Sequence, residues 1–413
     1  MTAQFDVLVF GATSFVGQIL CRYLTERTAQ GAVLNWAMAG RSRAKLESVR
    51  QSLGASAASI PLLVADAADG EALKDLVSRT RVVISTVGPY ALHGEPLVRA
   101  CVELGVDYCD LTGEVQWIRR MIERYEAEAI RSGARIVHCC GFDSIPSDLG
   151  VHYLQQQSMQ SFGEPCDRIS MRVRAMRGGF SGGTAASLLN VAREVSANPA
   201  LRKELANPYS LCQLGVAASG LAPVRQSSTS LFARDSATGG WISPFIMAAI
   251  NTRIVHRSNA LSAGRYSRAF RYDEAVSTGR GLRGCLTAVG AGVGLSLFML
   301  ASAFGPTRAA LQRFVLPAPG EGPSPEAQAK GFFDLRFFGR TVSGRLVRVK
   351  VTGDRDPGYG STAKMLGEAA MCLAFEVPRE TVAGGFWTPA TVFGDRLVTR
   401  LQAHAGLSFE RQE

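Results

Sequence analysis

The sequence predicts an α/β fold in which a doubly wound parallel sheet is followed by a second, α+β domain. A near-continuous apolar run over residues 5–10 precedes two glycines, Gly11 and Gly17, and a helical pattern begins between them. Further apolar runs alternate with helical patterns up to about residue 150, which is typical of strand–helix–strand units. A chain of 413 residues is also long enough to form two domains with separate cores.

The first element, FDVLVFGATSFVG at residues 5–17, has the pattern of a buried strand, a glycine loop and the start of a helix. Gly11 permits a tight turn, Gly17 lets the helix approach the sheet, and the helix N-terminus offers N–H groups to a pyrophosphate. Ser14 stands where a third glycine is usual, and we expect its hydroxyl to donate to a phosphate oxygen. A structural turn without a ligand is the alternative. The loop residues predicted to bind the cofactor are Gly11, Ala12, Thr13, Ser14, Phe15, Val16 and Gly17.

The second strand ends at Gly40 and is followed by Arg41, Ser42 and Lys45. An acidic residue at this place would bind the ribose hydroxyls of NAD, whereas an arginine pairs with a 2′-phosphate and stacks on adenine. These residues therefore predict NADP(H) as the cofactor, with an ordinary solvated helix start as the alternative.

The next strands end at the same edge of the predicted sheet. IPLLVADAAD ends at Asp66 and Ala67, RVVISTVGPY carries Thr86, Val87, Gly88 and Pro89 at its carboxyl end, and ARIVHCCGFDSIPSD follows later. Because ligands bind outside the carboxyl ends of parallel strands, we expect these loops to complete the dinucleotide site.

Composition excludes several classes of partner and site. The net charge of +10 and the pI near 9.3 indicate an anionic partner, but there is no basic tract, so we expect no nucleic acid. The nine cysteines are scattered without C-x-x-C pairs, and the chain opens directly into a strand, which together indicate a cytoplasmic protein. His138, Cys139 and Cys140 are adjacent, but neighbouring strand residues point to opposite faces, so we expect core packing and no metal site.

These motifs carry a family resemblance. GATSFVG, AGRS, STVGPY, HGEPLVRAC, DYCDLTGE and CGFDSIPSDLGV, together with FSGGTAAS, NTRIVHRSNAL and GYGSTAKMLGEAA near the other end, resemble the saccharopine dehydrogenase-like family and its trans-acting enoyl reductase branch. The resemblance covers nearly the whole chain and implies a Rossmann-type NADP-binding domain in an NADPH-dependent oxidoreductase. Enoyl reductases of this branch act on acyl chains held on a carrier or synthase, whereas saccharopine enzymes act on a C–N bond.

Residues 284–307 contain no charge and lie between Arg283 and Arg308. As a helix they would extend about 36 Å, enough for a bilayer core of about 30 Å. Helical glycines cost about 1 kcal/mol each relative to alanine, so we expect a one-sided, peripheral membrane contact rather than a span. A buried helix or a homodimer contact is the alternative. Either an exposed or a buried apolar surface of this length favours a lipid-like acyl substrate over a charged amino acid. The resemblance to the enoyl reductase branch implies glycolipid biosynthesis as the context.

The chain divides, by these patterns, into a dinucleotide domain at 1–150, a substrate or dimerisation domain at 151–359, and a segment at 360–413 that returns to the first domain. RISMRVRAMR and GRLVRVKVTGD alternate like half-buried strands, and SLLNVAREV has a helical pattern. The Gly-x-Ser-x-Gly pattern around Ser181 admits a hydrolase, but His256 and His404 stand in no convincing loop, so a glycine-rich helix start is favoured.

Enoyl reduction needs a donor for the developing enolate oxygen and a proton source. Tyr90 is the first candidate for the donor, with a packed ring as the alternative. Asp143 is a candidate acid if burial raises its pKa, Ser144 stands beside it, and Glu114 has a similar standing. An N-cap role is the alternative for Asp143 and Ser144. A membrane or lipid-surface binding protein that retains NADP as a structural ligand is the alternative outside the enzymes.

Overall fold

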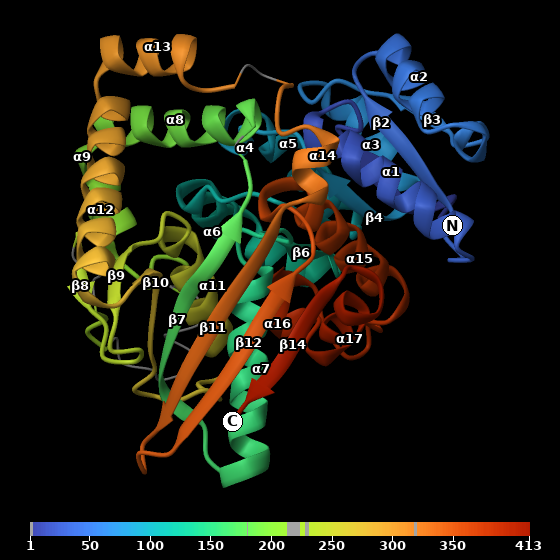
Figure 1. The fold of residues 1–413 in the computed structure, drawn as a ribbon. Coiled ribbons are helices and arrows are strands. Elements are labelled where there is room, and N and C mark those ends of the chain that lie inside the picture. Colours follow the sequence, from blue (N-terminus) through green and yellow to red (C-terminus); the bar gives the residue numbers. More distant parts are fainter. Residues whose placement is uncertain (1–2, 180, 213–223, 228–230, 318–319) are drawn as a thin grey trace.

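The computed structural model describes residues 3–179, 181–212, 224–227, 231–317 and 320–413, and within these ranges it has two large sheets (Figure 1). Sheet A is parallel throughout, and its order places β1 between β4 and β2. Every residue of β2 is buried, as expected for a strand covered on both faces. The strands of sheet A, in spatial order, are β13 (Gly385–Trp387), β6 (Arg135–Val137), β5 (Asp107–Asp110), β4 (Thr80–Ser85), β1 (Phe5–Phe10), β2 (Trp36–Gly40) and β3 (Leu62–Val64).

Helices cover both faces of sheet A, so the doubly wound prediction is confirmed. One core cluster joins the sheet to α1 (Phe15–Ala29), α2 (Arg43–Ser52) and α15 (Thr362–Phe375). The other joins it to α3 (Gly70–Ser78), α5 (Glu95–Leu104) and α6 (Val115–Ser132). Local sequence sets these helices: Ser14, Ser42 and Asp69 cap their N-termini with side-chain oxygens, and glycines in the left-handed conformation end α5 and α6.

Sheet B is mixed, because β7 and β10 run parallel while its other neighbouring strands are antiparallel. The predicted strands RISMRVRAMR and GRLVRVKVTGD lie in β7 and β12. In spatial order sheet B consists of β14 (Leu407–Gln412), β12 (Leu346–Gly353), β11 (Phe332–Thr341), β7 (Cys166–Arg177), β10 (Arg271–Gly279), β9 (Trp241–Pro244) and β8 (Ala233–Arg234).

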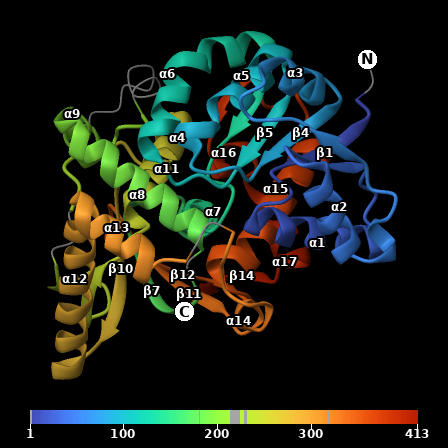
Figure 2. The same cartoon turned by 90° about the horizontal axis from the view of Figure 1, so that it is seen from above.

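The remaining helices connect and flank the two sheets. Figures 1 and 2 show α8 running from the side of the long α12 toward the dinucleotide sheet. Within the described residues, these remaining helices are α4 (Tyr90–His93), α7 (Ile145–Phe162), α8 (Gly182–Ala197), α9 (Pro199–Ala206), α11 (Ala248–Leu261), α12 (Gly281–Ala303), α13 (Gly305–Phe314), α14 (Pro325–Ala329), α16 (Pro389–Val392) and α17 (Asp395–His404), with short turns η1 (Ala55–Ala57) and η2 (Pro357–Ser361).

The end of the chain contributes to both sheets. The helix α15 packs on α1, β13 extends sheet A beside β6, and β14 extends sheet B beside β12. Segment 360–413 therefore joins the two sheets rather than returning to the first one alone. The limits 1–150, 151–359 and 360–413 remain predictions.

Candidate active site at the carboxyl edge of sheet A

The glycine loop lies at the switch point of sheet A, where β1 continues toward α1. Gly11 has φ +88°, and a Cβ on Gly17 would stand 2.1 Å from the carbonyl oxygen of Gly11. The backbone N–H groups of Phe15 and Val16, in the first turn of α1, have no acceptor among the described residues. A tight turn, a helix close to the sheet and free N–H groups at a helix N-terminus are what a pyrophosphate requires, so this loop fits NADP(H).

Ser14 has a local role that its sequence position did not predict. Its Oγ accepts the N–H of Gly17 at 2.9 Å and lies 2.9 Å from Oγ1 of Thr86. Thr86 in turn donates to the carbonyl of Gly11 at 2.9 Å. Ser14 is therefore the N-cap of α1, and it links the glycine loop to the end of β4 instead of leaving its hydroxyl free for a phosphate. Gly11 and Ala12 are buried, and Thr13 is partly exposed.

The basic residues after β2 are placed as a 2′-phosphate would require. Arg41 and Lys45 are exposed, and neither side chain has a hydrogen-bond or ion-pair partner among the described residues. Arg43 differs, because its guanidinium already pairs with Glu47 at 3.0 Å. Ser42 caps α2 by accepting the N–H of Lys45 at 3.4 Å. Arg41 and Lys45 thus remain available at the adenosine end of the site.

The other predicted cofactor residues occupy the same edge with different exposure. Asp66 is exposed and accepts the N–H of Ala68 at 2.9 Å, so it shapes its own turn beside the partly exposed Ala67. Val87 and Pro89 are partly exposed. Gly88 is exposed, and a Cβ on it would lie 3.6 Å from Oγ of Ser187. The loop after β4 therefore faces α8 of the second sheet's domain.

Tyr90 does not have the placement proposed for an enolate donor. Its side chain is 4% exposed, its ring packs on Trp117, and its hydroxyl donates to the carbonyl of Ser85 at 2.9 Å. Burial raises its pKa well above the ordinary value. The packed-ring alternative describes this geometry, and we assign Tyr90 no chemical role.

Ser144 is also directed away from the reaction. It is fully buried, and its hydroxyl donates to Asn251 of α11 at 3.1 Å. Asn251 donates in turn to Glu274 at 2.9 Å. Although Ser144 occupies the N-cap position of α7, its side chain makes no cap hydrogen bond. Ser144 therefore connects the loop after β6 to the strands of sheet B.

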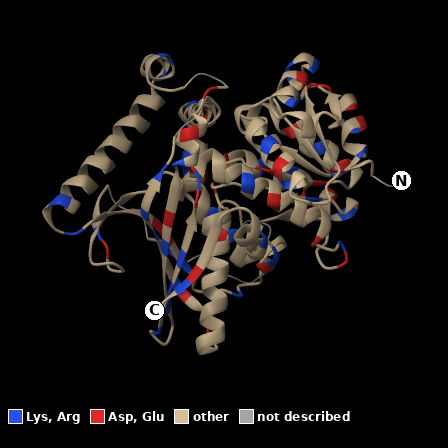
Figure 3. Ribbon diagram, turned by 45° about the vertical axis from the view of Figure 1, so that its right-hand side comes forward, with Lys and Arg blue, Asp and Glu red and all other residues tan. Residues whose placement is uncertain are grey.

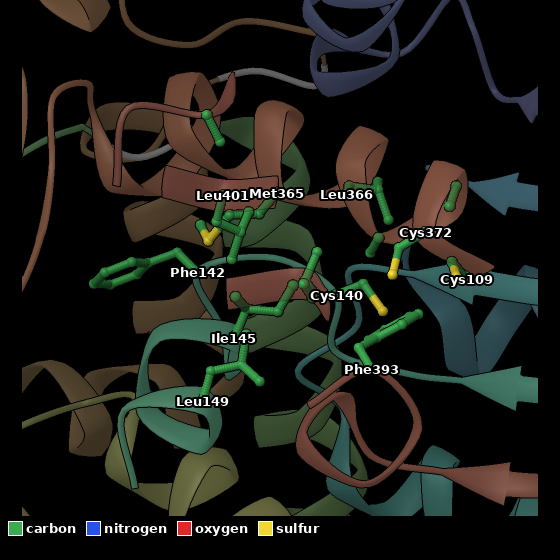
Figure 4. Close-up of a cluster of buried hydrophobic side chains, with 14 of the residues drawn as sticks. Cys109, Cys140, Phe142, Ile145, Leu149, Met365, Leu366, Cys372, Phe393 and Leu401 are labelled. Carbon is green, nitrogen blue, oxygen red and sulfur yellow. The ribbon is translucent and has the colours of Figure 1, made fainter. Parts of the chain in front are cut away.

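Asp143 is the carboxyl group that the structure leaves available. It is partly exposed in the loop between β6 and α7, and no side chain pairs with it among the described residues. Desolvation, and then the charge of Asp110, raise its pKa to about 7. Neighbouring residues anchor the loop, because Cys140, Phe142 and Ile145 lie in the core against α15 (Figure 4). A fixed carboxyl group that is half protonated near pH 7 suits general acid catalysis.

Glu114 serves as a clamp instead of an acid. Its carboxylate accepts the N–H groups of Tyr90 and Ala91 at 2.8 and 3.0 Å and the hydroxyl of Ser187 at 2.9 Å. Burial raises its pKa, but these donors act in the opposite direction. Glu114 therefore joins the loops after β4 and β5 to α8. Nothing local to Ser187 in the sequence indicated this contact.

A second contact between the two halves lies over the glycine loop. The rings of Phe15 and Tyr359 meet edge to face, with centroids 5.2 Å apart. The hydroxyl of Tyr359 accepts the N–H of Ser181 and lies 2.9 Å from Oγ1 of Thr184. The segment GYGS around Tyr359 belongs to the motifs that carry the family resemblance. Its position in the sequence did not predict that Tyr359 contacts Phe15 in the glycine loop.

The hydrolase alternative finds no support in the geometry. Ser181 is the N-cap of α8, and its Oγ accepts the N–H of Thr184 at 3.4 Å. Phe180, within the Gly-x-Ser-x-Gly pattern, lies outside the described residues. His256 is buried, and desolvation lowers its pKa to about 3. The described part of the chain contains no cluster of three or more His, Cys, Asp or Glu suited to a metal.

Comparisons with known proteins identify the family of the chain and its NADP-binding domain. The sequence family described as saccharopine dehydrogenase NADP binding domain matches residues 7–137. A Mycobacterium tuberculosis (strain H37Rv) protein, provisionally named a trans-acting enoyl reductase, is 40% identical over 411 residues, covering 98% of this chain and 97% of its own. A Mycobacterium bovis (strain BCG) protein named trans-acting enoyl reductase is 36% identical over 409 residues, covering 96% of both chains.

Among solved structures, the apo histidine-tagged saccharopine dehydrogenase (L-Glu forming) from Saccharomyces cerevisiae superposes with a TM-score of 0.52. It is 14% identical and covers 99% of both chains, so it shows the shared fold. The full-length relatives and the NADP-binding match show the family and the cofactor. The chain belongs to the saccharopine dehydrogenase-like family of NADP-dependent oxidoreductases, within the branch of the trans-acting enoyl reductases.

Proposed function

We propose that this protein reduces the carbon–carbon double bond of a lipid-like enoyl thioester, with Asp143 as the proton donor. The support is the placement of Asp143 at the edge of sheet A where the nicotinamide is expected. Arg41 marks the adenosine side beyond β2, and the glycine loop lies at the switch point. NADP(H) held by these residues would extend toward the ends of β4, β5 and β6, and Asp143 follows β6.

In this reaction the protein itself transfers one proton, from Asp143. NADPH, when bound, supplies a hydride to the β-carbon of the double bond. The O–H group of Asp143 then transfers its proton to the α-carbon, and the Asp143 carboxylate recovers a proton from water. The reaction consumes one hydride and one proton, and its activity should fall as pH rises through about 7, because only the protonated form of Asp143 donates.

The test uses Asp143→Asn with Ser144→Ala as its matched control. A short 2-enoyl thioester and a long-chain homologue serve as substrates, and NADPH fluorescence reports turnover. Asp143→Asn should lower kcat/KM by about 100-fold or more while NADPH affinity is kept. Ser144→Ala, whose hydroxyl faces Asn251, should retain activity within about threefold. An unchanged rate for Asp143→Asn would contradict the role of Asp143. Oxidation of saccharopine with NADP, without thioester reduction, would favour the C–N alternative.

We further propose that α12 and α13 contact an anionic membrane surface. Within the described residues, α12 is the one helix long and apolar enough to cross a membrane, and 17% of its most apolar window is buried. Its buried residues are small: Gly284, Ala288, Gly292 and Ser302. Its large side chains face outward, including Leu286 at 63%, Leu297 at 61% and Leu300 at 57% exposure. This arrangement inverts the usual amphipathic surface helix and leaves an apolar face to be covered.

Charge favours lipid as the cover. Between Glu274 and Glu321 the sequence has no acidic residue and four arginines, Arg280, Arg283, Arg308 and Arg313. Figure 3 shows α12 without charged residues along most of its length and with basic residues at its end. Basic groups beside an apolar helix suit anionic headgroups. One side of α12 packs against β9, β10 and α8 of the same chain. A helix lying along the membrane surface therefore fits this packing better than a helix that spans the membrane.

A further inference from the structure

Cys139, four residues before Asp143, has a strained backbone. Its φ of +62° lies in the left-handed region, and Ala263 is the other non-glycine residue there within the described part of the chain. A left-handed conformation costs a non-glycine residue about 1–2 kcal/mol, so surrounding contacts must hold it. Cys139 begins the turn that separates β6 from the loop of Asp143.

The contacts that hold this turn converge on Asp110, the last residue of β5. One carboxylate oxygen of Asp110 accepts the N–H of Cys139 at 3.2 Å and that of Thr112 at 3.1 Å. The other oxygen lies 2.6 Å from Nδ1 of His138. The backbone carbonyl of Asp110 accepts the N–H of Cys140 at 2.7 Å. A single, fully buried residue thus ties the loop after β5 to the loop after β6.

The sulfur of Cys139 makes a further contact between the loops after β5 and β6. Its Sγ lies 2.9 Å from the carbonyl oxygen of Thr112, on the same side of the turn. Thr112 is thereby linked both to Asp110 and to Cys139. Gly113 follows, and a Cβ on it would stand 3.6 Å from Oδ1 of Asp143. Asp143 therefore lies directly against the loop that Asp110 organises.

We propose that Asp110 is a positioning residue, whose carboxylate holds the left-handed turn at Cys139 and thereby fixes the place of Asp143. This inference rests on the proposed role of Asp143 as proton donor. The negative charge of Asp110 also favours the protonated form of its neighbour, because two carboxylates close together resist joint ionisation. The charge of Asp143 also acts on Cys139, in the loop after β6, and on Tyr90, at the start of α4.

Asp110→Asn tests the effect of the Asp110 charge on Asp143, because the amide oxygen can still accept the N–H groups of Cys139 and Thr112 while the negative charge is lost. The pH at which kcat/KM falls should move down by about one unit, which lowers the rate about tenfold at pH 8. NADPH affinity should stay within about twofold of the original, since within the described part of the chain Asp110 bonds to the loops after β5 and β6 and to neither the glycine loop nor Arg41. An unmoved pH profile would overturn the proposal.

Asp107→Asn is the matched control. Asp107 lies on the same strand, is also buried, and pairs with Arg135 at 2.5 Å and Arg379 at 3.0 Å. Its loss should lower stability without moving the pH profile. If Asp110→Asn folds poorly, the double variant Asp110→Asn, Cys139→Gly relieves the left-handed strain and should fold while keeping the displaced profile. A double variant with the original profile would also overturn the proposal.

A readout independent of turnover separates this inference from the proposed function. Infrared difference spectra between pH 5 and 9 should show the protonated carboxyl band of Asp143, identified by its loss in Asp143→Asn. In Asp110→Asn this band should vanish at lower pH than in the original protein. If thioesters are not reduced but the band moves, the proposed reaction fails and the role of Asp110 stands. A band that does not move contradicts the role of Asp110 whatever the activity.

Discussion

At the scale of single residues, Arg41 is predicted to decide which nicotinamide cofactor is preferred. Its exposed guanidinium has no partner among the described residues, whereas Arg43 next to it is paired with Glu47. A charge-assisted contact with the 2′-phosphate contributes about 1.5–3 kcal/mol, so Arg41→Ala should weaken NADPH about 10- to 100-fold. NADH, which lacks this phosphate, should change by less than about threefold.

Fluorescence titration with both cofactors measures this difference. Arg43→Ala provides the control and should change NADPH affinity less, because its side chain is engaged with Glu47. Equal weakening of NADPH and NADH in Arg41→Ala would mean that Arg41 stabilises the loop rather than the phosphate.

Residue types predicted the cofactor better than they predicted the reacting groups. The glycines, the helix start and Arg41 follow one another in the chain, so local pattern is enough to place them. The directions of the Tyr90 and Ser144 side chains could not be predicted from local pattern, because they depend on packing against Trp117 and on a hydrogen bond to Asn251, both later in the chain. Ser144 faces Asn251, and the pKa of Asp143 depends on burial and on Asp110.

At the scale of elements, α15 is anchored by one buried carboxylate. Glu368 is fully buried, and it accepts the hydroxyl of Tyr23 at 2.6 Å, Nε of Arg27 at 2.8 Å and Nε of Arg400 at 2.8 Å. It thus joins α15 to α1 and α17. Glu368→Ala leaves two largely buried guanidinium groups without this partner and should lower the free energy of unfolding by about 3 kcal/mol.

Urea unfolding gives the measurement, read as a lower midpoint with an unchanged slope. Glu376→Ala is the control, because Glu376 also pairs with Arg400 but is 37% exposed, so its loss should cost less than about 1 kcal/mol. Equal midpoints for the two variants would show that Glu368 contributes no more than a surface pair.

The elements were predicted unevenly for a related reason. Strand and helix patterns predicted that strands alternate with helices in the first part of the chain, since each buried strand is marked by its own residues, but they did not predict the spatial order of sheet A. The apolar segment at 284–307 was expected to be helical, and α12 covers it as far as Ala303, where the chain breaks before α13. Composition does not separate a helix buried in protein from one covered by lipid. The exposed leucines of α12, and the small residues on its buried face, show that the described part of this chain does not cover the outer face of the helix.

At the scale of the whole molecule, the exposed face of α12 sets how the protein would meet a membrane. Helix α8 contacts α12 at one end and bears Ser187 against Glu114 near the site at the other. A molecule resting on α12 and α13 would therefore have one helix between the lipid surface and the reacting groups. Such a placement suits a substrate with a long acyl chain.

Flotation with lipid vesicles tests this orientation. The protein should float with vesicles containing phosphatidylglycerol and less with phosphatidylcholine alone, because the four arginines near α12 and α13 add attraction to anionic headgroups. The double variant Leu297→Glu, Leu300→Glu should stay in the dense fraction, since each buried leucine contributes up to about 2 kcal/mol. The control Val342→Glu, Leu346→Glu adds the same charge at residues 78% and 61% exposed on the β11–β12 hairpin and should float. If the unaltered protein never floats while sedimentation shows a dimer that the α12 variant breaks, the apolar face is covered by a second copy and the membrane proposal is wrong.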